Sequence, residues 1–431
     1  MTASPSFEFA TAHRVLFGPA RAAELPALVD GWGSRSLVFT GTRPERHREL
    51  LDSLPVPAEV ITVAGEPTVE MARSAVQAGR TSGADVVIAI GGGSVLDLGK
   101  AVAALLGNGG DPLDYLEVIG RGLPITAPSA PYIAVPTTAG TGSEVSANAV
   151  LASPEHRRKA SLRSPFMLAR VALVDPLLTV GCPASVTAAS GLDALTQCLE
   201  PFVCPQATPL TDGFAAEGLR RAGQSLLTAF QDGSDVHART DMALASLLGG
   251  LSLANAKLGA VHGFAGVIGG MVEAAHGAVC AALLAPVVEV NVRALRERDP
   301  ANRALDRYAQ AARLLTGRPE ASIEDGVDWL REIVRSLRIP DLATLGVRRG
   351  DLGDHGDHGD HGDHGDHGDL GDLGDHGDVG GHGDVGGHVD LGGHDEIDEI
   401  VENARTSSSM RGNPIPLTDA ELREVLTASL D

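Results

Sequence analysis

The sequence predicts an α/β domain with a parallel sheet over residues 1–178, followed by an all-helical domain over residues 179–431. In the first part, short continuous apolar runs alternate with segments of helical spacing, as in strands that helices bury on both faces. Glycine- and threonine-rich turns follow two of these runs. Beyond about residue 175, nearly every segment has the apolar periodicity of a helix, which favours a second domain without a sheet.

The individual elements follow from the same patterns. Residues 84–90 form a continuous apolar run, and a helix should follow over residues 94–106. A helix over residues 68–83 is indicated by its apolar spacing and its final Ser-Gly. Thr418 and Glu421 form a capping box that should begin the last helix. The other expected strands are 7–17, 36–40, 59–65, 131–138 and 171–176. The other expected helices are a short one over residues 20–33 and several within 183–337 and after 396.

Composition limits the classes of partner. The net charge of -22 argues against nucleic acid or an anionic membrane, and no apolar run of about 18 uncharged residues predicts a membrane span. Thirteen aspartates lie between residues 351 and 395, and without them the net charge is about -9. The four scattered cysteines and the absence of a signal-peptide pattern favour a cytoplasmic protein.

Residues 351–394 form a Gly-Asp-x triplet repeat in which x is mostly His, Leu or Val. One interpretation is a tract that binds Zn, Ni or Ca loosely. The other, which we favour, is a disordered acidic insertion, because frequent glycine raises the entropy cost of order and few apolar residues can be buried.

A glycine-rich turn lies in the segment AIGGGSVLDLGKAVA, residues 89–103. Gly91, Gly92, Gly93 and Ser94 follow a buried strand and open a helix, whose free N–H groups suit a pyrophosphate. The turn matches neither the GxGxxG pattern nor the GKS or GKT ending of a P-loop. A tight turn without a ligand is the alternative.

A second loop, VPTTAGTGSEVS over residues 135–146, follows the next strand. In open α/β folds, ligands bind at the carboxyl edge of the sheet, where this loop should lie. Thr137, Thr138, Thr141 and Ser143 could therefore hydrogen-bond a ribose, a phosphate or a nicotinamide amide.

Two further motifs with polar side chains occur in the predicted helical part. Asp193 and Gln197 lie one turn apart in SGLDALTQCLE, on one helix face. His262 and His276 lie in the small, apolar stretch GAVHGFAGVIGGMVEAAHG. We expect VIGG to break this stretch, so that the two histidines come from successive segments. Each histidine alone is more often a core residue than a ligand.

Taken in order and spacing, these motifs resemble those of the iron-containing (group III) alcohol dehydrogenases, whose relatives include glycerol dehydrogenases and maleylacetate reductases. The resemblance covers roughly residues 7–348 and 396–430 and implies a Rossmann-like domain followed by a helical domain. It implies a cofactor site at the positions that match the family's motifs, namely Gly91, Gly92, Gly93, Ser94, Asp97, Thr137, Thr138, Thr141, Ser143 and Lys159. Lys100 also matches the family's pattern after the glycine turn.

The resemblance also implies a metal site. Asp193, His262 and His276 match three of the family's four ligands, and Gln197 stands where the family has a histidine. An Asp with two His suits Fe(II) or Zn(II), and Gln197 could add its carbonyl oxygen. Gly266 stands where another family histidine lies close to the nicotinamide.

The preference between NAD and NADP stays open. The strand-end acid that often contacts the adenosine ribose in the family is replaced by Gly41. Arg43 nearby could suit a 2'-phosphate.

The function that the resemblance implies is an NAD(P)-dependent alcohol dehydrogenase or aldehyde reductase. A divalent metal on Asp193, His262 and His276 would polarise the substrate oxygen during hydride transfer. A metal-independent enzyme similar to maleylacetate reductases is the alternative, and a metal-sequestering protein that works through its repeat is a non-enzyme alternative. The expected partners are a small alcohol or aldehyde and a second copy of the chain.

Overall fold

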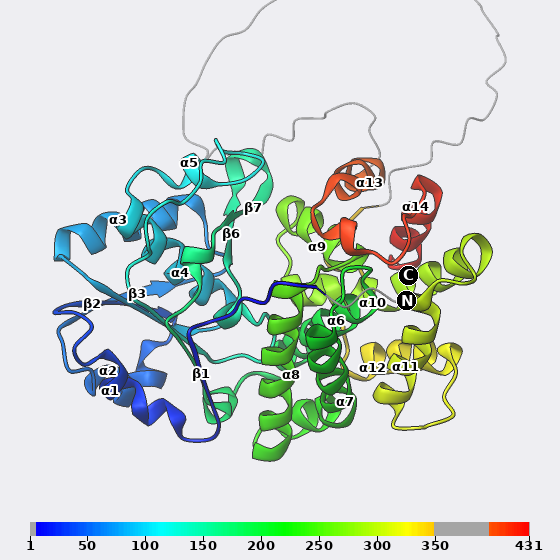
Figure 1. Cartoon of the computed structure of the whole chain (residues 1–431), viewed down its shortest axis with the longest axis horizontal. Helices are drawn as coiled ribbons and strands as arrows, with labels where there is room; N and C mark the ends of the chain where they lie inside the picture. The colour runs from blue at the N-terminus through cyan, green and yellow to red at the C-terminus, as the bar shows by residue number, and fades with distance from the viewer. Residues whose placement is uncertain (1–5, 349–395, 431) are drawn as a thin grey trace, which may run out of the picture.

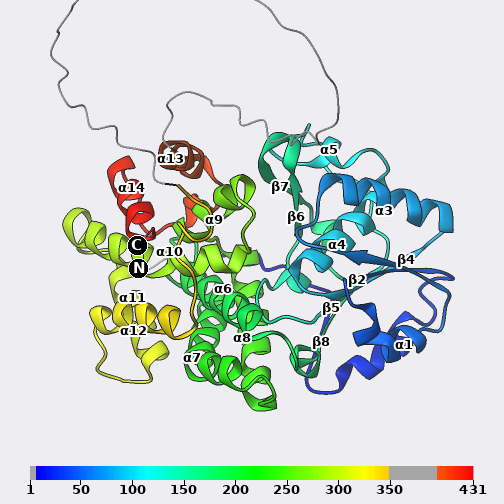
Figure 2. The same cartoon turned by 180° about the vertical axis from the view of Figure 1, so that it is seen from behind.

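The computed structural model describes residues 6–348 and 396–430, so the triplet repeat lies outside the described residues. A sheet-containing part and a helical part stand side by side (Figure 1), and the view from behind shows the same two parts (Figure 2). This arrangement confirms the predicted fold class, a parallel sheet with helices followed by an all-helical region.

The sheet has six strands, paired in parallel in the order β1-β8-β5-β4-β2-β3. The chain moves outward from β2 to β3, and later outward in the other direction from β4 to β5. The strand order therefore reverses between β2 and β4, where open α/β sheets form their ligand crevice. The strands are β1 (Arg14–Phe17), β2 (Ser36–Gly41), β3 (Ala58–Val63), β4 (Val86–Gly91), β5 (Tyr132–Pro136) and β8 (Val171–Val174).

Helices cover both faces of this sheet. α3 (Val69–Ser82) and α4 (Gly93–Asn108) pack on one face, and α1 (Leu25–Val29) and α2 (Arg48–Asp52) pack on the other. Every residue of β4 is buried, as expected of a strand that is covered on both sides. A short helix, α5 (Pro112–Tyr115), follows α4.

The start of the chain differs from the prediction. The first strand begins at Arg14 rather than at residue 7, because residues 6–12 cross onto the helical part instead of pairing with the sheet (Figure 1). The Asn255 side chain bonds both backbone groups of Ala10, and the rings of Phe9 and Phe214 lie 5.8 Å apart. The segment therefore ties the two parts together.

Sequence reasoning missed an antiparallel hairpin of β6 (Asn148–Ser153) and β7 (Arg158–Arg163). Its burial alternates along each strand, and it packs against α4 and α9 rather than joining the main sheet. Two short, half-buried strands carry no continuous apolar run, which is why the pattern was not recognised.

The helical part packs around one large core. By length and composition alone, α10 could cross a membrane, and so could α8 and α9 together as one bent span. However, 78% of that apolar stretch of α10 is buried inside the protein. The helices are α6 (Ala184–Val203), α7 (Pro209–Gln231), α8 (Val236–Asn255), α9 (Ala260–Met271), α10 (His276–Arg298), α11 (Arg303–Thr316), α12 (Ile323–Ser336), α13 (Glu396–Thr406) and α14 (Asp419–Ala428). The capping box of Thr418 and Glu421 begins α14, as predicted.

The expected helix break at VIGG is wrong. α9 continues through these residues, and the chain leaves the helix only at residues 272–275. A Cβ on Gly270 would lie 2.9 Å from Arg158 Cα, so this glycine allows α9 to approach the hairpin closely. The two histidines still come from successive segments, as expected.

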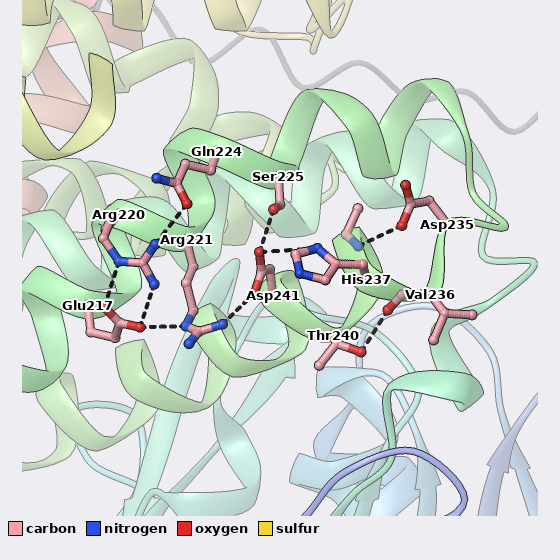
Figure 3. A network of polar contacts seen from close by, with 11 residues as sticks. Glu217, Arg220, Arg221, Gln224, Ser225, Asp235, Val236, His237, Thr240 and Asp241 are labelled. Atoms are coloured by element: carbon pink, nitrogen blue, oxygen red, sulfur yellow. Dashed lines mark hydrogen bonds and ion pairs between the residues drawn. The ribbon is translucent and has the colours of Figure 1, made fainter. Parts of the chain in front are cut away.

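A polar network joins α7 to α8 in the helical part (Figure 3). Glu217 accepts hydrogen bonds from Arg220 and Arg221, and Arg221 also pairs with Asp241 on α8. Ser225 donates to the other oxygen of Asp241 at 2.7 Å. Glu217 therefore lies between two arginines in a chain of charges that ties the two helices.

Replacing Glu217 by glutamine should weaken the fold in a pH-dependent way. The hydrogen bond from Arg220, followed by that from Arg221, lowers the pKa of Glu217 from 4.5 to about 2. Its stabilising effect is therefore present above pH 4.5 and lost as the pH falls towards 2. Because the side chain is 38% exposed, solvent screening limits the effect at neutral pH to about 1 kcal/mol or less.

Urea unfolding of wild type and Glu217→Gln at pH 7 and pH 3 measures this difference. Glu320→Gln, at an exposed carboxylate, is the matched control. A difference in unfolding free energy that is equal at the two pH values would contradict the assignment.

Candidate active site

The glycine-rich turn and the threonine loop lie together at the carboxyl edge of β4 and β5. Thr137 N–H donates to the carbonyl of Gly91 at 2.9 Å. A Cβ on Gly93 would lie 2.5 Å from Thr141 Cγ2, so a side chain there would collide with the loop. Gly92 begins α4 without a side-chain cap, and Gly92, Gly93 and Ser94 are partly exposed. An uncapped, accessible helix N-terminus beside glycines fits a pyrophosphate.

Two predicted cofactor positions, Asp97 and Ser143, form a polar network with Lys100 behind this turn. Lys100 is fully buried and donates to Ser143 O (2.6 Å), Ser143 Oγ (2.9 Å), Ser146 Oγ (3.1 Å) and Asn148 O (2.7 Å). Asp97 accepts from Ser143 Oγ at 2.5 Å and from Val150 N at 2.9 Å. In this structure the three side chains hold the threonine loop, and a direct cofactor contact of Asp97 or Ser143 stays a prediction.

Lys159 lies on β7, where the hairpin meets the helical part. Its Nζ is 3.3 Å from a carboxylate oxygen of Glu66, and its side chain is only 7% exposed. A Cβ on Gly269 of α9 would lie 3.0 Å from the same Nζ. The amine therefore lies between the sheet-containing part and α9.

The candidate metal ligands are brought together from three helices. Asp193 lies on α6, His262 on α9, and His276 is the first residue of α10. Together with Cys280, each offers a ligand atom within 4.8 Å of the others. His276 is partly exposed, whereas the other three are buried. The fold thus assembles the predicted set and adds a thiol that sequence reasoning missed, although it lies one helical turn after His276.

Gln197 lies beside this cluster, as its spacing from Asp193 predicts. Its Nε2 donates to Asp193 Oδ2 at 2.9 Å. Its Oε1 is buried and has no hydrogen-bond partner among the described residues. Since an orphaned buried acceptor is costly, this oxygen beside Asp193 fits a site that takes up a cation.

The charges of the cluster also favour a cation. Burial alone would raise the pKa of Asp193, but the hydrogen bond from His262 and the charges of His276 and His262 lower it below its ordinary value. Burial would lower the pKa of His262, but the charges of Cys280 and Glu200 and the bond to Asp193 raise it well above its ordinary value. The buried anionic groups therefore attract positive charge, which a proton or a metal ion can supply.

Glu200 is a second residue that sequence reasoning missed. Its Oε2 lies 2.6 Å from His262 Nδ1, and its Oε1 accepts from Val261 N–H at 2.8 Å. The carboxylate therefore caps the start of α9 and orients the His262 ring, whose Nε2 faces Asp193 at 3.2 Å. The available signal was its position two helical turns after Asp193 on α6, on the same helix face.

Replacing Glu200 by glutamine should lower the affinity of the cluster for Zn(II) by about 10–100-fold, the usual effect of losing a carboxylate behind a metal-binding histidine. Titration of the purified protein against a competing chelator measures this affinity. Glu273→Gln, at an exposed carboxylate three residues before His276, controls for the lost charge. Equal losses in both variants would contradict an orienting role for Glu200.

Close backbone contacts place the threonine loop next to the donor cluster. A Cβ on Gly140 would lie 2.7 Å from Ser190 Cβ, and Ser190 is one turn before Asp193 on α6. A Cβ on Gly142 would lie 2.4 Å from the Cα of Gly250 on α8. These glycines let the two parts meet at the candidate site.

Gly266, at the position of a family histidine, lies one turn after His262 on α9. A Cβ on Gly266 would meet no atom within 4 Å. The missing side chain therefore leaves space on the His262 face of α9.

A parallel sheet with an uncapped glycine turn, next to helices that carry a metal-type donor cluster, defines a class of two-part dehydrogenases. Residues 12–176 match the family of iron-containing alcohol dehydrogenases, and residues 187–363 match its C-terminal family. The chain belongs to the iron-containing alcohol dehydrogenase family.

Individual relatives support this family assignment. A long-chain-alcohol dehydrogenase of Geobacillus thermodenitrificans is 43% identical over 52% of this chain and 55% of its own length. A probable alcohol dehydrogenase of Escherichia coli is 36% identical over 67% of this chain and 68% of its own length. A crystal structure of 1,3-propanediol oxidoreductase is 26% identical, with a TM-score of 0.80 over 99% of this chain and 100% of that one. The matched segments span 55% to 68% of these curated relatives' length.

Proposed function

We propose that this chain is an NAD(P)-dependent alcohol dehydrogenase or aldehyde reductase. The reaction is hydride transfer between the nicotinamide and a carbinol or carbonyl carbon. The contact of Gly140 with Ser190 carries the proposal, because it places the cofactor-side loop one helical turn from Asp193. The family and the names of the relatives support the same reaction class.

On this proposal, residues 1–178 form the cofactor domain and residues 179–431 form the metal and substrate domain. The turn at Gly91–Ser94 binds the pyrophosphate through the free N–H groups of α4. Thr137, Thr138 and Thr141 lie along the nicotinamide half, on the loop that Lys100 holds. Lys159 adds a positive charge beside the same edge.

The donor set fits a divalent metal, Fe(II) or Zn(II), held by Asp193, His262 and His276 with Gln197 beside them. A bound metal would supply Lewis acidity towards the substrate oxygen. The protein's own contribution is to keep Asp193 ionised and to fix the His262 ring through Glu200. Burial of Asp193 and His262 keeps water away from that side of the site.

The choice between NAD and NADP depends on the end of β2. Gly41 ends this strand at the crevice beside β4, and a Cβ on it would meet no atom within 4 Å. No carboxylate is present at Gly41 to repel a 2'-phosphate, and Arg43 follows it with its side chain exposed. We therefore propose that the site accepts NADP as well as NAD.

The test combines metal analysis with cofactor binding on one preparation. We expect about one metal per chain, fluorescence-detected binding of NADH or NADPH, and oxidation of primary alcohols from short diols to long chains. A panel with matching aldehydes defines the substrate class, and gel filtration tests the proposed homodimer. Full activity after chelation and verified metal loss would favour the metal-independent alternative, and no binding of either nucleotide would overturn the proposal.

A further inference from the structure

The thiol of Cys280 lies within the donor cluster. Cys280 is buried on α10, one helical turn after His276, and its Sγ lies 3.6 Å from His276 Nε2. The other three cysteines, at positions 182, 198 and 204, are not members of the cluster. The resemblance to the family assigns no ligand to this position.

The distances within the cluster suit a tetrahedral ion. With metal–sulfur and metal–nitrogen bonds of about 2.3 and 2.1 Å, tetrahedral angles place the sulfur and nitrogen about 3.6 Å apart. His276 Nε2 and Cys280 Sγ have this separation. A nitrogen–oxygen pair should lie about 3.4 Å apart by the same geometry, and His262 Nε2 is 3.2 Å from Asp193 Oδ1. These two donor pairs thus have separations that suit coordination, and all four donors lie within 4.8 Å of one another.

Gln197 is the competing fourth donor. Its hydrogen bond joins it to Asp193, through an amide nitrogen that cannot bind a cation while it donates. Its free Oε1 is a neutral, hard oxygen, whereas a Cys280 thiolate would add a negative charge and a soft donor. The thiol also contacts His276, and both residues lie on α10, whereas Asp193 and Gln197 lie on α6.

We propose that Cys280 is the fourth protein ligand of this site and that its thiolate makes the site prefer Zn(II) over Fe(II). The proposal rests on the metal site of the proposed function and specifies its chemistry. On binding, the S–H bond breaks, its proton leaves to solvent, and the sulfur electron pair forms the bond to zinc. The fourth ligand would thus come from α10 instead of the family's position on α6.

X-ray absorption of the zinc-loaded wild type tests the ligand directly. We expect one sulfur neighbour per zinc at about 2.3 Å, retained in Cys182→Ser and absent from Cys280→Ser. Replacing zinc by Co(II) should add a thiolate-to-cobalt charge-transfer band to wild type and Cys182→Ser alone. Cys280→Ser should lose more zinc affinity than the roughly 10–100-fold expected for an outer partner.

Anaerobic competition between equal concentrations of Fe(II) and Zn(II) tests the preference. We expect the ratio of bound zinc to bound iron to be at least about tenfold higher in wild type than in Cys280→Ser. Zinc with only nitrogen and oxygen neighbours in wild type would overturn the Cys280 proposal and leave the proposed reaction standing. Failure of wild type to bind any of the three ions would overturn both the Cys280 proposal and the metal part of the proposed function. The wild-type spectrum decides the ligand even where a variant does not fold.

Discussion

Replacing Asp193 by asparagine should leave the protein without stoichiometric metal and lower kcat/KM for alcohol oxidation by roughly 10²–10³-fold. Asn retains the shape of Asp193 but removes the anionic ligand that His262 and Gln197 both contact. A metal Lewis acid contributes several kcal/mol of transition-state stabilisation, and each 1.4 kcal/mol corresponds to about tenfold in rate. Elemental analysis and steady-state kinetics on the same preparation measure both effects.

Thr196→Ser is the matched control for Asp193→Asn. Thr196 is also buried on α6, and its hydroxyl donates to the backbone carbonyl of Leu192 at 2.7 Å. This variant should keep its metal and its activity. If Asp193→Asn lost its metal while kcat/KM stayed at the wild-type value, the metal would have no part in the reaction.

Replacing Lys100 by methionine should lower the free energy of unfolding by about 3–5 kcal/mol, the usual effect of breaking a buried ionic contact on one side. Burial lowers the pKa of Lys100 to about 8 against the opposing charges of Asp97 and Glu144, so the amine is charged at pH 7. Methionine fills the space but donates none of the bonds to Ser143, Ser146 and Asn148. The threonine loop should loosen, so that the affinity for NAD(P)H falls as well as the stability.

Urea unfolding and nucleotide titration measure the two effects of Lys100→Met. The double variant Asp97→Asn/Lys100→Met should recover part of the stability, because it also removes the carboxylate left without its cation. A single variant as stable as wild type would show that the buried amine does not hold the loop. If the single variant were destabilised but bound the nucleotide with unchanged affinity, the threonine loop would not be part of the cofactor site.

Much of the sheet could be predicted from local sequence. The apolar run of β4 is buried at every residue because two layers of helices cover it. A strand that is buried on both faces has a continuous apolar sequence, which can be recognised without the structure. The glycine turn was recognisable because Gly93 has no room for a side chain beside Thr141. The hairpin of β6 and β7 was not, because its half-buried strands lack a continuous apolar run.

The candidate site was predictable only in part. The resemblance of its motifs identified Asp193, His262 and His276, which the structure brings together from three helices. Cys280 and Glu200 were missed, although each lies at helical spacing from one of these residues. Spacing shows which residues share a face, but it does not show which faces of different helices meet.

The sequence by itself therefore determined the fold class, the glycine turn and three of the donors, because each is a local pattern or an ordered set of motifs. The tertiary structure decided the contacts of Lys100, Glu200 and Cys280. Lys100 lies in a strong cofactor motif, yet its amine bonds the loop behind the turn. The physical reason is that a buried polar side chain must find its partners among residues that only the packing of distant segments brings near.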